Sequence, residues 1–285
     1  MDNSMSIGPA VKVLIVAVIL GLWTSGCGAS GSSDSGAGGP RNAATLIAER
    51  SDTTWDLVAL GDSTPTGYGV GAENSYVNVY AGYISEDLGV EVVVHNQATN
   101  ATRKVTRWVE VIRTDEELRE ELRNAEVVTI WMGWHDLIPS IGLARGGPCY
   151  PQVDIVDVDC FRSITDPMRQ GFDDLLSEIT SLANPNETLI FIADTGIPFV
   201  SQWLQDGTLD ELKGPAYEEW RGHLIEAAEN HGIHVVYTYH VINGPNGDQT
   251  LPPEYSLPDG LHFSVEGHQL IADLHRDIGY EYLVP

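Results

Sequence analysis

Short apolar runs alternate with longer amphipathic stretches along most of this chain. The apolar runs are rich in β-branched residues and predict five buried strands, over residues 55–60, 90–95, 127–132, 189–193 and 233–239. The amphipathic stretches predict helices over residues 75–88, 103–125 in two pieces, 166–183, 215–231 and 264–277. Such alternation is typical of βαβ units, so we expect a three-layer α/β/α domain with a five-stranded parallel sheet.

Two segments interrupt this alternation. Residues 137–165 form a long excursion without a regular period, and residues 244–260 form a loop rich in Pro and Gly. Ser264 follows that loop and is expected to cap the last helix. Nothing in the pattern requires a domain boundary between residues 46 and 285.

The first 45 residues follow a different pattern. Lys12 precedes an uncharged run, residues 13–23, that is short for a membrane span. The run ends in small residues before Cys27, which resembles the lipobox of bacterial lipoproteins, although Thr24 stands where that family usually has Leu. We therefore expect residues 1–26 to be a lipoprotein-type signal peptide and Cys27 to carry the lipid. An ordinary cleaved signal peptide and an uncleaved anchor are the alternatives.

This reading divides the chain into three parts and gives it a location. Residues 27–45 are mostly Gly, Ser and Ala and are expected to form a flexible tether, which leaves residues 46–285 as the folded domain. The protein is then expected to be a cell-membrane lipoprotein facing the extracytoplasmic side, or secreted if Cys27 is not lipidated.

The charge of the chain limits its partners. The 285 residues include 15 Lys plus Arg and 41 Asp plus Glu, for a formal charge of −26. Removing residues 1–26 deletes one cation, Lys12, and one anion, Asp2, so the acidity belongs to the exported part. Phosphate backbones need cations, and we therefore expect no nucleic-acid partner. The same charge disfavours close approach to anionic lipid surfaces.

Cysteine and glycine patterns bear on disulfides and cofactors. Ten residues lie between Cys149 and Cys160, a spacing that favours a disulfide in a protein expected to be exported. The acidic residues between them leave a hard-cation loop as an alternative without further support. We expect no metal, because the histidines outside the Ser63 site show no metal-ligand spacing, and no cofactor, because no Gly-rich phosphate-binding motif follows a strand.

The residues best placed for chemistry follow the strands, because ligands of open α/β sheets bind beyond the carboxyl ends of the strands. Ser63 follows the first strand in a turn of small residues, 61–67. Near the other end of the chain, Asp259 and His262 precede the last helix. An Asp can orient a His that activates a serine, so these three side chains form a candidate catalytic triad. A capping turn with a solvated His is the alternative for the Asp259–His262 pair.

Together, Gly61-Asp62-Ser63 and Asp259-x-x-His262 resemble the blocks of the SGNH hydrolases, also called the GDSL esterases and lipases. The resemblance implies a flavodoxin-like SGNH hydrolase fold for the exported domain. It also implies that Ser63 is the nucleophile, His262 its base and Asp259 the residue that orients the base.

The resemblance implies an oxyanion hole in which two residues depart from the family pattern. The backbone N–H of Ser63 is one donor, Ala101 occupies the position of a Gly, and His135 occupies that of an Asn. A backbone N–H from Ala and an imidazole N–H can both donate to an oxyanion. In the same blocks, four further residues are expected to support the site: Asp62, Asn100, Gly133 and Asp136.

We therefore expect an extracytoplasmic serine esterase that forms an acyl-enzyme on Ser63. Its substrate is expected to be a small-molecule or glycan ester: an acetylated carbohydrate, a short-chain ester or a lysolipid. The alternative is a surface binding protein on the same scaffold, with catalysis impaired at Ala101 and His135. The sequence does not choose among these esters or give the oligomeric state, for which a monomer is the default.

Overall fold

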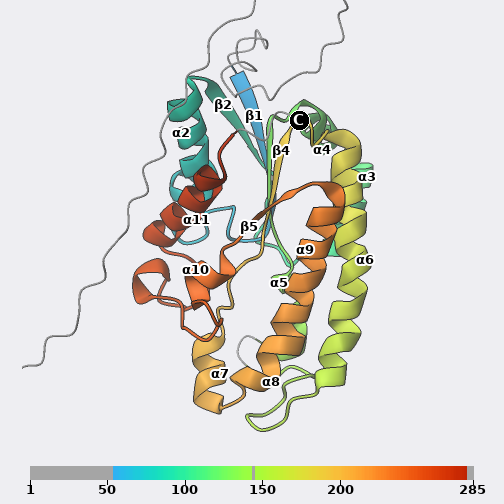
Figure 1. The fold of residues 1–285 in the computed structure, drawn as a ribbon, viewed down its shortest axis with the longest axis vertical. Coiled ribbons are helices and arrows are strands. Elements are labelled where there is room, and N and C mark those ends of the chain that lie inside the picture. The colour runs from blue at the N-terminus through green and yellow to red at the C-terminus, as the bar shows by residue number, and fades with distance from the viewer. Residues whose placement is uncertain (1–53, 143–144, 281–285) are drawn as a thin grey trace, which may run out of the picture. The chain divides into compact units, whose positions relative to one another are not determined.

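The computed structural model describes residues 54–142 and 145–280, so the expected signal peptide, tether and Cys27 lie outside the described residues. Five parallel strands form one sheet in the order β2-β1-β3-β4-β5 (Figure 1). Their bounds are β1 Thr54–Gly61, β2 Glu91–Asn96, β3 Val127–Trp131, β4 Leu189–Ala193 and β5 His234–Val236. The predicted α/β fold with a five-stranded parallel sheet is confirmed.

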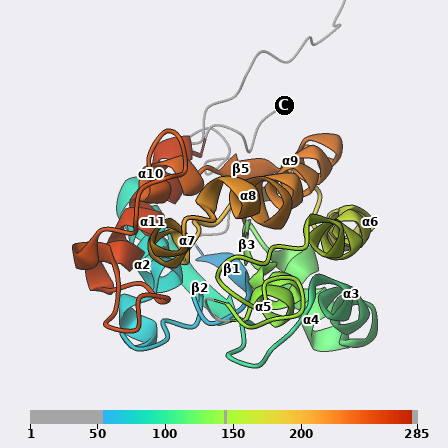
Figure 2. The same ribbon diagram turned by 90° about the horizontal axis from the view of Figure 1, so that it is seen from below.

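Helices cover both faces of the sheet, which gives three layers (Figures 1 and 2). One face carries α2 Tyr76–Leu88 and α11 Val265–Ile278, and the other carries α3 Val105–Thr114, α4 Glu116–Asn124, α6 Val158–Leu182 and α9 Glu219–His231. Side chains alternate between the two layers along a strand, so Val58 and Leu60 join one core while Leu57 and Ala59 join the other. Every residue of β3 and β4 is buried, which explains why β4 reads as an unbroken apolar run and β3 as one interrupted by Thr129.

Side-chain caps mark the starts of α2, α4, α6 and α11. Ser75 Oγ accepts a hydrogen bond from Asn78 N–H, and Ser264 Oγ accepts one from Gly267 N–H. Asp115 caps α4 by accepting from Leu118 N–H, and this cap divides residues 103–125 into the two predicted helical pieces.

The prediction that residues 137–165 form a long segment without a regular period is wrong in part. It contains most of α5 Trp134–Ile141 and the first turns of α6, which begins at residue 158 and not at 166. Both helices bury apolar side chains at helical spacing across an internal proline, Pro139 in α5 and Pro167 in α6. Proline usually ends a helix, and its presence hides these two from a pattern-based prediction.

The fifth strand is also shorter than predicted. It stops at Val236, because Thr238 N–H donates to the buried carboxylate of Asp194 and the chain then turns into α10 Tyr239–Asn243. Short helical turns occupy the other connections: η1 Ala72–Asn74, α7 Val200–Asp206, α8 Leu209–Lys213, the π-helical η2 Gly214–Glu218 and η3 Pro253–Tyr255.

A disulfide joins Cys149 and Cys160, as the cysteine spacing predicts. Residues 149 and 150 bind to α5 and α7 through hydrogen bonds. The Cys149 N–H donates to Ser140 O on α5, and Tyr150 Oη donates to Asp206 Oδ2 on α7. Within the described ranges no helix is both long and apolar enough to cross a bilayer.

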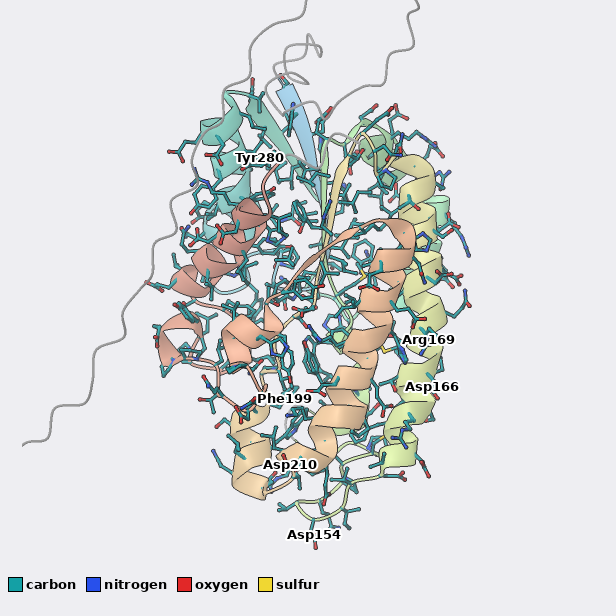
Figure 3. All side chains as sticks on the ribbon, viewed as in Figure 1. Asp154, Asp166, Arg169, Phe199, Asp210 and Tyr280 are labelled. Carbon is teal, nitrogen blue, oxygen red and sulfur yellow. A yellow bond between two sulfur atoms is a disulfide. The ribbon has the colours of Figure 1, made fainter. Side chains whose placement is uncertain are left out.

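The strands all run toward the end of the domain where α7 and α8 lie (Figure 1). Figure 3 shows Phe199 and Asp210 at this end, and Tyr280, which follows α11, toward the opposite end. The candidate chemistry after each strand is therefore gathered at one edge of the sheet.

Candidate active site

Three side chains from opposite ends of the chain form a hydrogen-bonded series at this edge. Ser63 follows β1, and its Oγ lies 3.1 Å from Nε2 of His262, which precedes α11. Nδ1 of His262 lies 2.7 Å from Oδ2 of Asp259. Because a carboxylate accepts, Nδ1 carries the ring hydrogen and Nε2 is left as the acceptor for the serine hydroxyl.

The Asp259 carboxylate is held in its charged form. Burial raises its pKa, but hydrogen bonds from the backbone and ring of His262 and from the Leu261 N–H hold the pKa below its usual value. Oδ1 accepts both backbone bonds, at 2.9 Å from Leu261 and 3.0 Å from His262. A single turn of chain therefore fixes the carboxylate and the imidazole together.

The turn that presents Ser63 requires the glycine before it. Gly61 has φ +151°, and a Cβ at this position would lie 2.1 Å from Trp131 O. The following Asp62 is buried and accepts a hydrogen bond from Thr64 N–H at 3.1 Å. Burial raises its pKa to about 6, although that hydrogen bond and the nearby His135 and His262 act in the opposite direction.

His135 lies in the first turn of α5, the helix that follows β3 in the sequence. Its Nδ1 accepts a hydrogen bond from Arg103 N–H at 3.1 Å, so the hydrogen of the neutral ring is on Nε2. The next residue, Asp136, accepts from Val105 N–H at 3.1 Å, and burial raises its pKa. Gly133 starts the helix with φ +124° at a point where a Cβ would lie 2.4 Å from the Trp220 ring.

Ala101 and Asn100 lie away from these side chains. The Ala101 N–H donates to Thr99 Oγ1 at 3.1 Å, and Ala101 is exposed and absent from the cavity lining described below. Asn100 is exposed, with Oδ1 2.7 Å from Thr66 Oγ1. The Ser63 N–H is different, because it has no hydrogen-bond acceptor within residues 54–142 and 145–280. The structure thus brings Ser63, His135, His262 and Asp259 together, and it directs the Ala101 N–H elsewhere.

An apolar cavity of about 90 Å³ opens beside Ser63, His135 and His262. Its walls come from residues after several strands: Trp131, Trp134, Ile138, Ile197, Ile242, Leu251 and Phe263. Sequence analysis did not select the four aliphatic ones. Ile197 follows β4 by four residues, so strand-end reasoning applied to every strand would have included it. The apolar walls suit a hydrocarbon group held against the serine.

One aromatic ring flanks the imidazole from outside the cavity. Tyr68 is 46% exposed, and its ring centroid lies 4.3 Å from that of His262. This contact restricts the orientation of the His262 ring from the side that faces solvent.

Three solved structures with a similar fold are described as a lipase and two esterases. The lipase Lip_vut3 from a goat rumen metagenome superposes with a TM-score of 0.64 at 23% identity, covering 79% of this chain and 98% of the lipase. A variant of Axe2, an acetyl-xylooligosaccharide esterase from Geobacillus stearmophilus, has a TM-score of 0.53 at 17% identity, with 80% and 94% covered. The psychrotrophic esterase EstA from Pseudoalteromonas sp. has a TM-score of 0.51 at 17% identity, with 78% and 94% covered.

Sequence comparisons identify the family. No curated protein sequence matches the chain significantly. The model of the GDSL-like lipase/acylhydrolase family matches residues 59–270, a range that includes the Ser63 and His262 blocks and most of the fold. The chain therefore belongs to the GDSL-like lipase/acylhydrolase family, the SGNH hydrolases that the sequence resembles, and its class is that of ester-hydrolysing serine hydrolases.

Proposed function

We propose that this protein is an extracytoplasmic serine esterase that cleaves short-chain carboxylic esters, including acetylated carbohydrates, through an acyl-enzyme on Ser63. The observation that carries the proposal is the series Ser63–His262–Asp259, with distances of 3.1 and 2.7 Å, beside a small apolar cavity. Cys27 is proposed to tether the domain to the membrane through a lipid.

Each group in this series has one task. Ser63 Oγ attacks the ester carbonyl while its proton passes to His262 Nε2, and Asp259 stabilises the resulting imidazolium. When the tetrahedral intermediate collapses, the same proton goes to the leaving alcohol oxygen. A water molecule then repeats the sequence on the acyl-enzyme, and the acid is released with Ser63 restored.

With the hydrogen bonds given above, two donors are available to the oxyanion in this proposal. One is the Ser63 N–H, and the other is the Nε2–H of His135, whose tautomer is set by the Arg103 N–H. The expected third donor, Ala101, first has to release Thr99 Oγ1 and turn its N–H inward. Asp62, Asn100, Gly133 and Asp136 are proposed to support these groups through the contacts given above.

The size of the cavity favours a short acyl group. About 90 Å³ is less than the ~150 Å³ of an engineered apolar cavity that accepts a benzene ring. An acetyl or other short acyl group fits this space better than a fatty acyl chain does. The similarity to the fold of an acetyl-xylooligosaccharide esterase supports the same choice.

The test compares the wild-type domain with its Ser63→Ala variant on p-nitrophenyl acetate. We expect turnover by the wild type and a loss of about 10³-fold or more in the variant, because the variant lacks the hydroxyl that lies 3.1 Å from His262 Nε2 and forms the acyl-enzyme. Labelling with a fluorophosphonate should likewise require Ser63. Equal rates in the two proteins would overturn the proposal. A folded wild type that neither turns over esters nor labels would favour a surface binding protein.

A further inference from the structure

We propose that the groove between α7 and the turn 259–261 binds the alcohol part of the ester, and that it takes a neutral, polyhydroxylated alcohol such as a sugar. This inference rests on the proposed esterase function and selects among its substrates. The groove is lined mainly by Pro198, Ser201, Gln202, Gln205, Asp259 and Leu261.

The position of the groove fits a leaving group. Pro198 and Leu261 line both this groove and the apolar cavity beside Ser63, so the two spaces are neighbours. One wall is the turn that leads directly into His262, and His262 must deliver its proton to the leaving alcohol oxygen. An ester with its acyl group in the cavity can therefore extend its alcohol along the groove.

The polar side chains of the groove present hydrogen-bond acceptors. On α7, Gln202 Nε2 donates to Asp206 Oδ1 at 2.9 Å, and Gln205 Nε2 donates to Ser201 Oγ at 3.3 Å. These bonds hold the two amide groups by their nitrogens and leave their oxygens as acceptors. Sugar hydroxyls are matching donors.

The apolar part of the groove matches the rest of a sugar ring. Pro198, Phe199 and Leu261 form its apolar wall, and Figure 3 shows Phe199 close to α7. Such a wall can pack against the C–H face of a pyranose. A polar rim with an apolar wall is the combination that a sugar requires and a plain alkyl alcohol does not.

Charge excludes the phosphorylated alternative. None of the groove-lining residues is Lys or Arg, and Asp259 contributes a carboxylate. The guanidinium of Arg145, which reaches α7, is paired with Asp206 at 3.2 Å. A phosphate on the alcohol would thus meet a carboxylate without a compensating cation, which disfavours lysophospholipids.

The first experiment compares two acetyl esters in the full-length protein and in a Gln202→Ala/Gln205→Ala variant. We expect kcat/KM on a mono-O-acetylated xylobiose, whose other hydroxyls are free, to fall about tenfold through the loss of two hydrogen bonds, while kcat/KM on p-nitrophenyl acetate stays within about twofold. Gln170→Ala serves as the matched control, because Gln170 lies on α6 and bonds only to Asp174 on the same helix. Equal effects on both substrates, or none on either, would overturn the groove assignment.

The second experiment uses a matched charge pair, glycerol monoacetate and its phosphate monoester. We expect the wild type to prefer the neutral ester and a Gln205→Lys variant to reduce that preference by tenfold or more at low salt. A wild type that prefers the phosphorylated ester would contradict the inference. The two proposals fail separately: if turnover of p-nitrophenyl acetate still requires Ser63, the esterase proposal stands even when the groove assignment does not.

Discussion

Position 135 carries an imidazole where the family pattern has an asparagine amide, and the local hydrogen bonds show how the replacement is accommodated. The Arg103 N–H bonds to Nδ1, and so a neutral ring always presents Nε2–H. An asparagine would donate from a shorter side chain. The histidine thus keeps one N–H donor without needing a positive charge.

Replacing His135 should therefore affect the transition state more than substrate binding. We expect His135→Ala to lower kcat on p-nitrophenyl acetate by about 10²–10³-fold with little change in KM, as when an oxyanion donor is removed. His135→Asn restores a side-chain N–H and should recover part of that loss. Steady-state kinetics of the three proteins checks this, and an unchanged kcat in His135→Ala would remove His135 from the oxyanion hole.

At the same scale, the sequence predicts the triad better than the oxyanion hole. Ser63, Asp259 and His262 are placed by strand ends and by a three-residue spacing, both of which are visible in the sequence. The direction of the Ala101 N–H depends instead on a local hydroxyl, Thr99 Oγ1, 3.1 Å away. Backbone orientation in such a loop has no signature in residue type, so the departure of Ala101 from the site could not be predicted.

Among the secondary-structure elements, α5 has the most influence on the site because it carries His135 and Ile138 into the cavity wall. Its start is fixed by Gly133, which has a positive φ and lies against the buried Trp220 ring. Two independent constraints therefore act on one residue: the backbone conformation and the space beside it.

Gly133→Ala should destabilise the fold more than the same change at a glycine that has a positive φ but open space around its Cβ position. We expect Gly133→Ala to lower the free energy of unfolding by about 2 kcal/mol or more, and to reduce activity because α5 must shift away from Trp220. Gly89→Ala is the matched control: Gly89 has φ +70° and open space around its Cβ position, so it should cost about 1 kcal/mol. Urea unfolding of both variants measures the difference, and equal costs would show that the Trp220 contact is unimportant.

Elements with an unbroken pattern were predicted within a few residues, and those that break a local rule were not. The strands β3 and β4 are apolar runs, interrupted in β3 by Thr129, and appear almost where expected. The helices α5 and α6 contain Pro139 and Pro167, and tertiary packing of their apolar faces outweighs the proline. The end of β5 depends on the buried Asp194, a long-range contact that no local pattern records.

For the molecule as a whole, a buried polar chain joins one face of the sheet to its covering helices. Tyr76 on α2 lies 3.2 Å from Thr129 on β3, and Thr129 lies 3.0 Å from Nε2 of His275 on α11. Nδ1 of His275 donates to Ile271 O at 2.8 Å, so Nε2 has to accept. A second buried imidazole, His268, accepts from Tyr76 N–H through Nδ1. The His268 ring fits its surroundings only when neutral, because its Nδ1 has to accept from a backbone N–H.

This arrangement predicts acid sensitivity with a definite sign. Burial lowers the pKa of His268 and of His275 from 6.5 to about 4. As the pH falls from 6.5 toward 4, the unfolded chain takes up protons that the native fold does not, so stability is lost across this window. The raised pKa of Asp62 acts in the opposite direction over part of the same range.

The contribution of His275 to the pH dependence of stability can be measured with one variant. His275→Gln removes one titrating group and leaves Asp62 in place. The slope of unfolding free energy against pH should be less steep than in the wild type by up to about 1.4 kcal/mol per pH unit between pH 6 and 4.5. Urea unfolding at several pH values gives both slopes. Parallel curves would mean that His275 titrates alike in the folded and unfolded chains.

Ser63 and His262 meet across 199 positions of sequence, near the two ends of the described fold. The nucleophile is therefore without its base until the last helix docks against α2. A chain interrupted during synthesis, or clipped before Asp259, would retain most of its core and yet be unable to hydrolyse an ester, because it would lack His262. Ester turnover in this protein should therefore report when the chain has finished folding, because it requires the first strand and the last helix to be in place together.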